Sequence, residues 1–372
     1  MTQLQLACIV GARPNFMKMA PLLRALEGES LAGKARATLI HTGQHYDKNL
    51  SDVFFEELGM RRPDISLEVG SGSHAVQTAR VLERMEEVLQ KGPAGGGRFD
   101  RLVVVGDVNS TMAASLAAVK LGVSVAHVEA GLRSFDRTMP EEINRIVTDS
   151  ISDLLLVSDP AGIDNLAHEG HPDEQVHLVG NVMIDTLMRM LPQAGELDSP
   201  GSLGLEPGQY GVVTLHRPAN VDDPKVLAGL VEVLVDISSK IPLVFPVHPR
   251  TAERLARTGL LDQFEQASGI HLREPLGYLN FLSLTSQARV IVTDSGGLQE
   301  ESTVLGIPCL TMRPNTERPV TVDIGTSTLI GSDPDILRKN LIAVLEGKYK
   351  PGKCPELWDG HAAERIAELL VG

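Results

Sequence analysis

The stretch VIVTDSGGLQEE, residues 290–301, joins an apolar, β-branched run to a segment of helical character through a turn of small residues. Val290–Thr293 is typical of a buried strand, and the glycines that follow favour a tight turn into a helix. The unpaired N–H groups and positive dipole end of such a helix start suit a pyrophosphate. Because any tight strand-to-helix turn favours glycine, this pattern alone is moderately specific for that ligand.

The same alternation of apolar runs and helix-like stretches continues on both sides of this turn. Such alternation predicts βαβ units and mainly parallel sheets. Proline and glycine accumulate between residues 191 and 209 with few apolar residues, which indicates an interdomain linker. A chain of 372 residues also exceeds the usual size of one hydrophobic core, so we predict two α/β domains. The strand-like runs are residues 4–10, 37–41, 102–105, 123–128, 211–215, 243–247, 290–293 and 308–312.

Composition excludes several classes of protein. The net charge is -14 and the sequence pI is about 5.3, which argues against a broad surface for nucleic acid or anionic membranes. We find no apolar run long enough to cross a bilayer and no secretory signal, so we expect no membrane partner. The three cysteines are far apart, and Cys8 and Cys309 lie in apolar runs, which favours a reduced, cytoplasmic setting.

Ligands of open α/β sheets lie beyond the carboxyl ends of the strands, so residues that follow each apolar run are the first candidates for a site. The first run ends in GARP, residues 11–14, and the next segment carries Lys18. Arg13 and Lys18, together with N–H groups at a helix start, fit a phosphate clamp. A turn with solvated basic residues is an equally good interpretation of this motif.

Carboxylates follow two further strand-like runs in the first half of the chain. Asp107 fits either a helix cap or a site residue. Glu129 ends a buried run, and a glutamate in that place needs a partner or a chemical task. Glu141 and Arg145 lie one helical turn apart, so an ordinary ion pair is the simpler interpretation of their spacing.

Basic and acidic residues also follow the strand-like runs of the second half. His216 and Arg217 close the run 211–215, although a lone histidine at a strand end is usually structural. Glu301 lies one turn into the helix predicted after Gly297, where its carboxylate is able to accept hydrogen bonds from ribose hydroxyls.

Two further patterns resemble ligand-binding motifs but are not interpreted as binding sites. GSGSHA, residues 70–75, matches a permissive dinucleotide motif but follows a later strand, and no acidic residue ends a strand about twenty residues on. Asp333 precedes Pro334 and is predicted to cap a helix rather than to bind a metal. With no histidine and cysteine cluster at zinc spacing, we expect neither a metal nor a nicotinamide cofactor.

Eight motifs, in one order along nearly the whole chain, resemble the non-hydrolysing UDP-N-acetylglucosamine 2-epimerases. Each motif alone is weak, and their shared order carries the resemblance. They are GARP (11–14) with Lys18, TGQH (42–45), GD (106–107), HVEAGLR (127–133), PEEINR (140–145), HR (216–217), DSGG (294–297) with QEE (299–301), and TERP (316–319).

The resemblance implies the GT-B architecture, in which two Rossmann-like domains face each other across the active-site cleft. It also implies a cytoplasmic homodimer that needs no cofactor. The expected organisation is an N-terminal domain with the catalytic acids (1–185), a linker (186–209), a C-terminal UDP-binding domain (210–358) and a C-terminal helix packed back on the N-terminal domain (359–372).

The reaction implied by the resemblance interconverts UDP-N-acetylglucosamine and UDP-N-acetylmannosamine, for precursors of bacterial surface polysaccharides. UDP is eliminated to give an enzyme-held 2-acetamidoglucal, and is then added back with inversion at C2. No carbonyl group acidifies the C2 hydrogen, so the enzyme must stabilise the leaving pyrophosphate and move a proton on each face of the ring. The motif set contains both the cations and the acids that this requires.

The resemblance assigns roles to matching positions. The expected catalytic set has Asp107 and Glu129 or Glu141 sharing proton transfer, while Lys18 and His216 help UDP to leave. The catalytic residues are Lys18, Asp107, Glu129, Glu141, Arg145 and His216, and the substrate-binding residues are Arg13, Phe281, Ser295, Gly296, Gly297, Glu301 and Arg318.

The chain departs from the family pattern at several positions. Asn15 replaces a frequent glutamate, and Leu276 replaces a frequent glutamine near the nucleotide. Gln44, His45 and His248 are candidate allosteric residues, but the sequence after His45 is Tyr-Asp where substrate-activated members commonly have arginine.

Four alternatives remain at this stage, two of which are a hydrolysing epimerase, which would release free N-acetylmannosamine and UDP, and a non-catalytic regulator that binds UDP-sugars. A related branch that acts on UDP-2,3-diacetamido uronic acids shares the stretch around His45. A GT-B glycosyltransferase would use the same UDP-sugar crevice with an acceptor pocket and usually one base, whereas this chain has at least three acids at successive strand ends.

Overall fold

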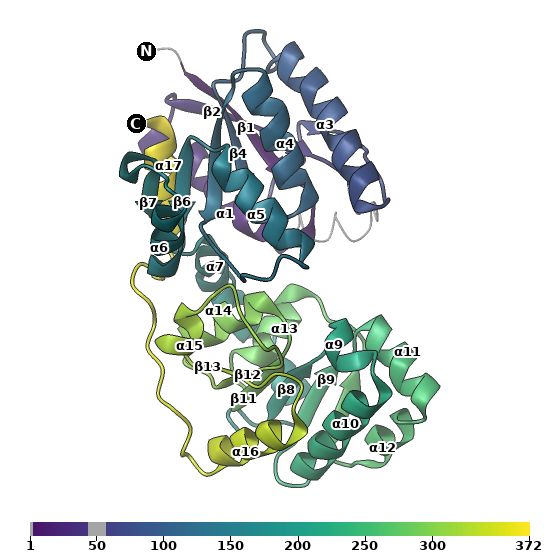
Figure 1. Ribbon diagram of the computed structural model, residues 1–372. Coiled ribbons are helices and arrows are strands. Elements are labelled where there is room, and N and C mark those ends of the chain that lie inside the picture. The colour runs from purple at the N-terminus through teal and green to yellow at the C-terminus, as the bar shows by residue number, and fades with distance from the viewer. Residues whose placement is uncertain (1–2, 44–56) are drawn as a thin grey trace. The chain divides into compact units, whose positions relative to one another are not determined.

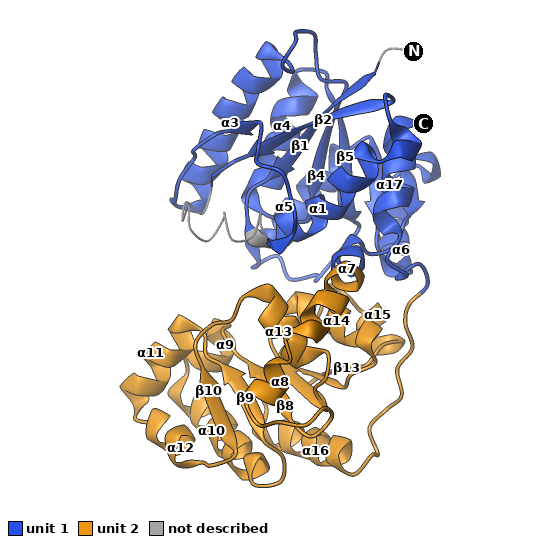
Figure 2. Cartoon of the chain, turned by 180° about the vertical axis from the view of Figure 1, so that it is seen from behind, with its two compact units in different colours: residues 1–186, 356–372 blue, residues 187–355 orange. Residues whose placement is uncertain are grey.

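The computed structural model describes residues 3–43 and 57–372, and the chain forms two compact units. Unit 1 comprises Met1–Thr186 and Glu356–Gly372, and unit 2 comprises Leu187–Pro355 (Figures 1 and 2). The candidate allosteric residues Gln44 and His45 lie outside the described residues. In the described part of the chain, no helix combines the length and the apolar character needed to cross a membrane.

Unit 1 is a parallel sheet with helices on both faces, and its described strands have the order β3-β2-β1-β4-β5-β6-β7. Side chains alternate along β1, so Ala7 and Ile9 join the apolar cluster that α3 and α4 complete, while Leu6 and Cys8 face the other side. The elements are β1 (Leu4–Val10), α1 (Arg13–Glu27), η1 (Glu29–Leu31), β2 (Ala35–His41), β3 (Ile65–Ser66), α3 (His74–Lys91), β4 (Arg101–Val105), α4 (Asn109–Lys120), β5 (Ser124–Ala130), α5 (Pro140–Ser150), β6 (Leu154–Val157), α6 (Pro160–His168), η2 (Asp173–Gln175), β7 (Val176–Leu178), the start of α7 (Val182–Glu196), and α17 (Ala362–Val371).

Unit 2 repeats this plan with a parallel sheet of order β10-β9-β8-β11-β12-β13. Val213 and Val292 lie in one apolar cluster while Val212 and Ile291 lie in another, so helices cover both faces of the sheet. The elements are α8 (Ser199–Ser202), β8 (Gly211–Thr214), α9 (Pro218–Val221), α10 (Pro224–Ser238), β9 (Leu243–Pro246), α11 (Pro249–Thr258), α12 (Leu261–Gln266), β10 (Ile270–Arg273), α13 (Tyr278–Thr285), β11 (Val290–Thr293), α14 (Gly296–Leu305), β12 (Cys309–Thr311), α15 (Val320–Asp323), β13 (Ser327–Leu329) and α16 (Pro334–Leu345).

In both units the strand order reverses beside the first strand, which is the arrangement of Rossmann-like folds. The prediction of α/β architecture is therefore confirmed. The stretch 186–209, expected as a linker, instead holds the end of α7 and the short helix α8, and the boundary between the units falls within α7. Asp333 caps α16 by accepting hydrogen bonds from the N–H groups of Asp335 (2.9 Å) and Ile336 (3.1 Å), as predicted.

The C-terminal segment is held in unit 1 by polar and apolar contacts. Asp185 caps α17 by accepting hydrogen bonds from the N–H groups of Ala362 (3.2 Å) and Ala363 (2.7 Å). The indole of Trp358 is 2 % exposed and donates a 2.9 Å hydrogen bond to the carbonyl of Ser158. Since α17 packs against α1, these anchors support the helix that carries Lys18.

We expect Trp358→Ala to lower the free energy of unfolding of unit 1 by about 3–5 kcal/mol, because a large buried side chain is lost and a cavity remains. Urea unfolding should be followed by far-UV circular dichroism, since Trp358 is the only tryptophan in the sequence. Trp358→Phe keeps most of the apolar bulk and should lose much less. Equal losses in the two variants would contradict the packing argument.

Candidate active site

Lys18 and Glu129 form a buried ion pair at the carboxyl edge of the unit 1 sheet. The side chains are 7 % and 6 % exposed, and Lys18 Nζ contacts Glu129 Oε2. Gly106 leaves room for them, because a Cβ there would lie 3.1 Å from Lys18 Nζ and 3.3 Å from Glu129 Oε2. With φ at +69°, Gly106 also has a backbone that other residues rarely adopt.

Glu129 has an unusual backbone conformation. Its φ is +72°, and the register of β5 against β6 shifts between Val128 and Ala130, so Glu129 lies at a bulge. A non-glycine residue in this region costs about 1–3 kcal/mol, and such strain is concentrated at functional sites. The bulge turns the carboxylate of Glu129 toward Lys18 instead of leaving it in the strand alternation.

Asp107 and Arg145 form a second ion pair at this edge. Arg145 Nη1 lies 2.5 Å from Asp107 Oδ2, and the guanidinium is 2 % exposed whereas the Asp107 side chain is 30 % exposed. The N-cap position of α4 is Val108, the residue after Asp107. The carboxylate of Asp107 is therefore held by a buried cation while part of it stays open to solvent.

Arg145 takes Glu142, and not Glu141, as its partner on α5. Glu142 Oε2 lies 2.9 Å from Arg145 Nη2 and 3.1 Å from Nε. Burial opposes ionisation of Glu142, but hydrogen bonds from Ser134 and the contact with Arg145 leave its pKa below the ordinary value. Glu141 lies half-buried in the first turn of α5. The simpler interpretation of its spacing, an ion pair between Glu141 and Arg145, is wrong, because Arg145 pairs with Glu142.

A buried histidine supports the backbone of this edge. His127 Nδ1 lies 2.6 Å from Asp149 Oδ1, and Nε2 lies 2.9 Å from the carbonyl of Gly106. Both ring nitrogens thus face oxygen atoms, which fixes the orientation of the ring. Burial opposes ionisation of Asp149, but His127 and Arg133 lower its pKa, so the ionised carboxylate pairs with the guanidinium of Arg133. His127 thereby fixes the residue before Asp107.

The motif after β1 has a structural role that its sequence left open. Asn15 Oδ1 accepts hydrogen bonds from the N–H groups of Gly11 (3.2 Å) and Ala12 (3.0 Å), and Nδ2 donates to the carbonyl of Val105 (2.8 Å). Asn15 thus ties the end of β1 to the end of β4. Arg13 begins α1, and its side chain lies outside the described part of the structure.

The Lys18–Glu129 pair provides a prediction on stability. Glu129→Gln should destabilise unit 1 by about 3–5 kcal/mol, because it leaves a buried ammonium without its counter-charge. Lys18→Met combined with Glu129→Leu removes both charges and should recover most of that loss, as thermal unfolding would show. If the double variant were no more stable than Glu129→Gln, burial of the lone charge would not be the cause.

In unit 2, Asp294 organises the residues that follow β8. Asp294 Oδ2 accepts hydrogen bonds from the N–H groups of His216 (2.9 Å) and Arg217 (2.8 Å) and from Asn220 Nδ2 (3.0 Å). Asp294 Oδ1 lies 2.7 Å from His216 Nδ1, with the His216 side chain 41 % exposed. Burial opposes ionisation of Asp294, but His216 and these donors lower its pKa.

His248 lies beside His216, with ring centroids 5.5 Å apart. Its Nδ1 accepts a 3.2 Å hydrogen bond from the N–H of Arg250 at the start of α11. Partial burial and the neighbouring His216 lower the pKa of His248, so this ring favours the neutral form. The structure thus places a predicted allosteric residue next to a predicted catalytic one.

The N-terminus of α14 lies over a buried ionic network. Arg318 contacts Glu300 (2.6 Å) and Glu317, and Arg313 lies 2.7 Å from Glu317. A Cβ at Gly296 would lie 3.2 Å from both Arg318 Nη1 and Glu317 Oε1, which places this ion pair beside the helix start. Free backbone N–H groups and a positive helix end next to Arg318 make a site suited to an anion.

Other predicted binding residues surround α14. Glu301 is 5 % exposed and accepts a 2.9 Å hydrogen bond from the hydroxyl of Tyr278. Phe281, on the same helix as Tyr278, is partly buried against the apolar cluster of this unit. A Cβ at Gly297 would meet no atom within 4 Å, so space is open beside Gly297.

The structure therefore brings Lys18, Glu129, Asp107 and Arg145 together in unit 1. Sequence reasoning missed the residues that hold this set in place. Glu142 and Asp149 share the buried face of α5 with the predicted Arg145, at positions i, i+3 and i+7, but the sequence does not show which face of the helix is buried. In unit 2 it gave no role to Asp294, the first residue of the DSGG motif, and missed Arg313. Among the described residues, no group of three or more His, Cys, Asp or Glu side chains could hold a metal ion.

Comparison with known proteins gives one consistent result. The family model described as UDP-N-acetylglucosamine 2-epimerase matches residues 29–371. The UDP-N-acetylglucosamine 2-epimerase of Methanococcus maripaludis is 40% identical over 375 residues, covering 99% of this chain and 98% of that protein. The UDP-2,3-diacetamido-2,3-dideoxy-D-glucuronate 2-epimerase of Pseudomonas aeruginosa is 39% identical over 372 residues, covering 99% of both chains.

A solved structure shares the whole fold. The crystal structure of the Methanocaldococcus jannaschii UDP-GlcNAc 2-epimerase, in complex with UDP-GlcNAc and UDP, has a TM-score of 0.85 and 40% sequence identity, with 99% of each chain covered. Two Rossmann-like units of the GT-B type are therefore the fold of this chain as well.

Proposed function

This chain belongs to the UDP-N-acetylglucosamine 2-epimerase family of isomerases, and from this premise we propose that it interconverts UDP-N-acetylglucosamine and UDP-N-acetylmannosamine. The reaction begins with loss of the C2 proton and cleavage of the bond from C1 to the diphosphate. It ends when UDP adds back at C1 and C2 is reprotonated on the opposite face. Protons and UDP leave and return, so no electrons pass to a cofactor.

The observation that carries this proposal is a pair of carboxylates, each held by a cation, at one sheet edge of unit 1. Glu129 is paired with Lys18, and Asp107 is paired with Arg145. A neighbouring cation favours the ionised carboxylate, which is the form that accepts a proton from C2. Glu141 remains a candidate for the second face of the ring.

UDP binding belongs, in this proposal, to unit 2. The start of α14 and Arg318 receive the diphosphate, and Glu301 receives ribose hydroxyls, with Phe281 beside the uracil. Support comes from the open space at Gly297 and from the position of Arg318 beside Gly296. His216, which Asp294 orients, joins Lys18 in neutralising the charge on the leaving diphosphate.

We also propose a cytoplasmic homodimer that supplies precursors for surface polysaccharides. Incubation with UDP-N-acetylglucosamine in deuterated water, without an acceptor sugar, tests the central reaction. Deuterium at C2 of both intact UDP-sugars is the expected result. Release of free N-acetylmannosamine would indicate a hydrolysing epimerase, and absence of exchange would contradict an epimerase and favour a glycosyltransferase or a binding protein.

A UDP-2,3-diacetamido uronic acid is the second candidate substrate, and the 39% identity to the Pseudomonas aeruginosa enzyme favours it. We expect the same exchange assay to give the higher kcat/KM with UDP-N-acetylglucosamine, because the TERP motif at 316–319 is retained. Measurement of kcat/KM for both substrates under one set of conditions shows which of them the enzyme prefers. A higher kcat/KM for the uronate would reverse this assignment.

A further inference from the structure

The loop between β5 and α5, residues 131–139, presents an aromatic side chain that the proposed reaction has not used. Phe135 is 79 % exposed, the highest value among the exposed large apolar side chains of the described residues. Its φ is +57°, a backbone conformation that is uncommon for a bulky residue. Single exposed apolar residues are normal on protein surfaces, but exposure combined with backbone strain points to a function.

A buried carboxylate holds this strained segment in place. Glu142 Oε1 accepts a 2.8 Å hydrogen bond from the N–H of Phe135, and Oε2 accepts hydrogen bonds from the N–H (2.9 Å) and Oγ (3.0 Å) of Ser134. The Glu142 side chain is 2 % exposed. The conformation of the loop is therefore determined by the interior of unit 1 and not by solvent.

The same carboxylate also holds the catalytic pair. Glu142 Oε2 lies 2.9 Å from Arg145 Nη2, and Arg145 Nη1 lies 2.5 Å from Asp107 Oδ2. One buried group thus determines the position of the Phe135 backbone and, through one guanidinium, the position of Asp107. A loop with no part in the reaction would not need this link.

Resting on the proposed function, we propose that the ring of Phe135 packs on the hexose of the nucleotide sugar. Glu142 is then the positioning residue, because it fixes both the loop that carries Phe135 and, through Arg145, the carboxylate of Asp107. The hexose is the part of the substrate that Asp107 must reach, because C2 belongs to it. Its C–H faces and the acetamido methyl group are apolar, and they complement an aromatic ring. The flat unsaturated sugar formed on loss of UDP offers the ring a still better face.

This contact has a consequence for the intermediate. Between loss and return of UDP, the unsaturated sugar is held by non-covalent contacts alone. A ring packed on the sugar keeps water from the reacting carbons and retains the intermediate until UDP adds back. Removal of the ring should therefore increase the release of free 2-acetamidoglucal relative to epimerisation.

The variants Phe135→Ala and Phe135→Tyr test the contact, with KM, kcat, released glucal and inhibition by UDP as readouts. Phe135→Ala should lower kcat/KM by about ten- to hundredfold, the value of one buried aromatic side chain, mainly through KM. It should also release more glucal per turnover, while UDP inhibits as in the wild type. Phe135→Tyr keeps the ring and should restore both properties.

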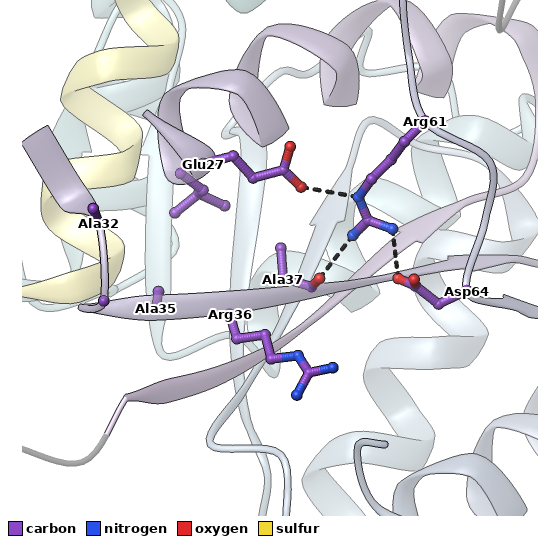
Figure 3. A pocket seen from close by; sticks show the side chains of 9 residues that line it. Glu27, Ala32, Ala35, Arg36, Ala37, Arg61 and Asp64 are labelled. Atoms are coloured by element: carbon purple, nitrogen blue, oxygen red, sulfur yellow. Dashed lines mark hydrogen bonds and ion pairs between the residues drawn. The ribbon is translucent and has the colours of Figure 1, made fainter. Parts of the chain in front are cut away.

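Glu142→Gln tests the positioning residue. The amide keeps one acceptor for the loop but opposes Arg145 with N–H groups, so kcat and KM should both change in the folded enzyme. Glu27→Gln is the control, because Glu27 Oε1 accepts a 2.9 Å hydrogen bond from Arg61 at the amino-terminal edge of the sheet, beside a separate pocket (Figure 3). If Glu142 had only a structural role, Glu142→Gln would behave like Glu27→Gln, with a lower unfolding temperature and an unchanged KM.

The outcomes separate this inference from the proposed function. If the wild type incorporates no deuterium at C2, the proposed function fails first. If the wild type exchanges while Phe135→Ala keeps wild-type KM and releases no glucal, the sugar contact is overturned. Conversion of a dimer to a monomer with unchanged constants would assign Phe135 to a contact between copies and also overturn it. Unchanged constants in Glu142→Gln would remove the positioning role.

Discussion

Replacing Asp107 by asparagine is expected to lower kcat for C2 epimerisation by about 10²–10⁴-fold, the usual range for loss of a proton-transfer group. Asparagine has the same shape, and its carbonyl is able to accept the hydrogen bond from Arg145 Nη1 that Asp107 Oδ2 now accepts. The amide does not take up a proton from carbon. The affinity for UDP should stay unchanged, because Asp107 is not among the proposed diphosphate contacts.

Asp64→Asn is the matched control for this experiment. Asp64 Oδ2 lies 2.7 Å from Arg61 Nη1, so the control also removes one carboxylate paired with arginine in unit 1, but on the side of β2 and β3 (Figure 3) and not after β4, where Asp107 lies. We expect wild-type kcat from Asp64→Asn. Initial rates in deuterated water and UDP titration measure both properties. Equal activity in Asp107→Asn would eliminate Asp107 as a proton-transfer residue.

The partner of Arg145 shows where sequence reasoning reached its limit. Spacing placed Arg145 one turn from Glu141, but only the rotation of α5 about its axis decides which of two adjacent glutamates faces the interior. That rotation follows from packing against the sheet, where Glu142 and Arg145 are both buried. The chemistry of the segment was predictable from the sequence, whereas the pairing was not.

The backbone at Glu129 could not be predicted for a different reason. The sequence identified a carboxylate at the end of a buried strand, and the structure places it there. Its positive φ arises from the bulge at which β5 shifts register against β6, which is a tertiary feature. Local propensity disfavours this conformation for glutamate, so the pattern of residues contains no signal for it.

The fold was most predictable where strands are fully buried. β1 and β11 have the predicted bounds, because strands covered on both faces are continuous apolar runs. β7 and β10 lie at the edges of their sheets and are only half-buried, so they lack such runs. The linker prediction relied on proline and glycine content, but Pro192 lies inside α7 and Pro200 in the first turn of α8.

Asp294→Asn is expected to lower kcat by about 10²–10⁴-fold, although Asp294 is not proposed to touch the substrate. Asp294 Oδ1 lies 2.7 Å from His216 Nδ1, and Oδ2 accepts hydrogen bonds from two backbone N–H groups and Asn220. An amide at this place turns an N–H group toward one of these donors. The imidazole of His216 then loses both its orientation and the carboxylate that faces its Nδ1.

The same substitution should alter the response to acid. The pKa of Asp294 is lowered in the folded state, so its carboxylate stabilises unit 2 above the unfolded pKa, and this contribution is lost as pH falls through the folded pKa. The amide introduced by Asp294→Asn cannot titrate in this way, so the unfolding temperature of this variant should fall less steeply as the pH is lowered. Thermal unfolding measured across the acid range checks this. An unchanged pH dependence would show that Asp294 makes no such contribution.

A double-variant cycle distinguishes action through His216 from a separate role of Asp294. If Asp294 acts by orienting the imidazole, then once His216→Ala has removed the ring, adding Asp294→Asn should cost little further activity. Asp236→Asn is the control, because Asp236 on α10 pairs with Arg338 on α16 in the same unit and makes no contact with His216 or Asp294 among the described interactions. Losses of kcat that multiply in the double variant would mean that the two residues act independently, and the orienting role of Asp294 would then be wrong.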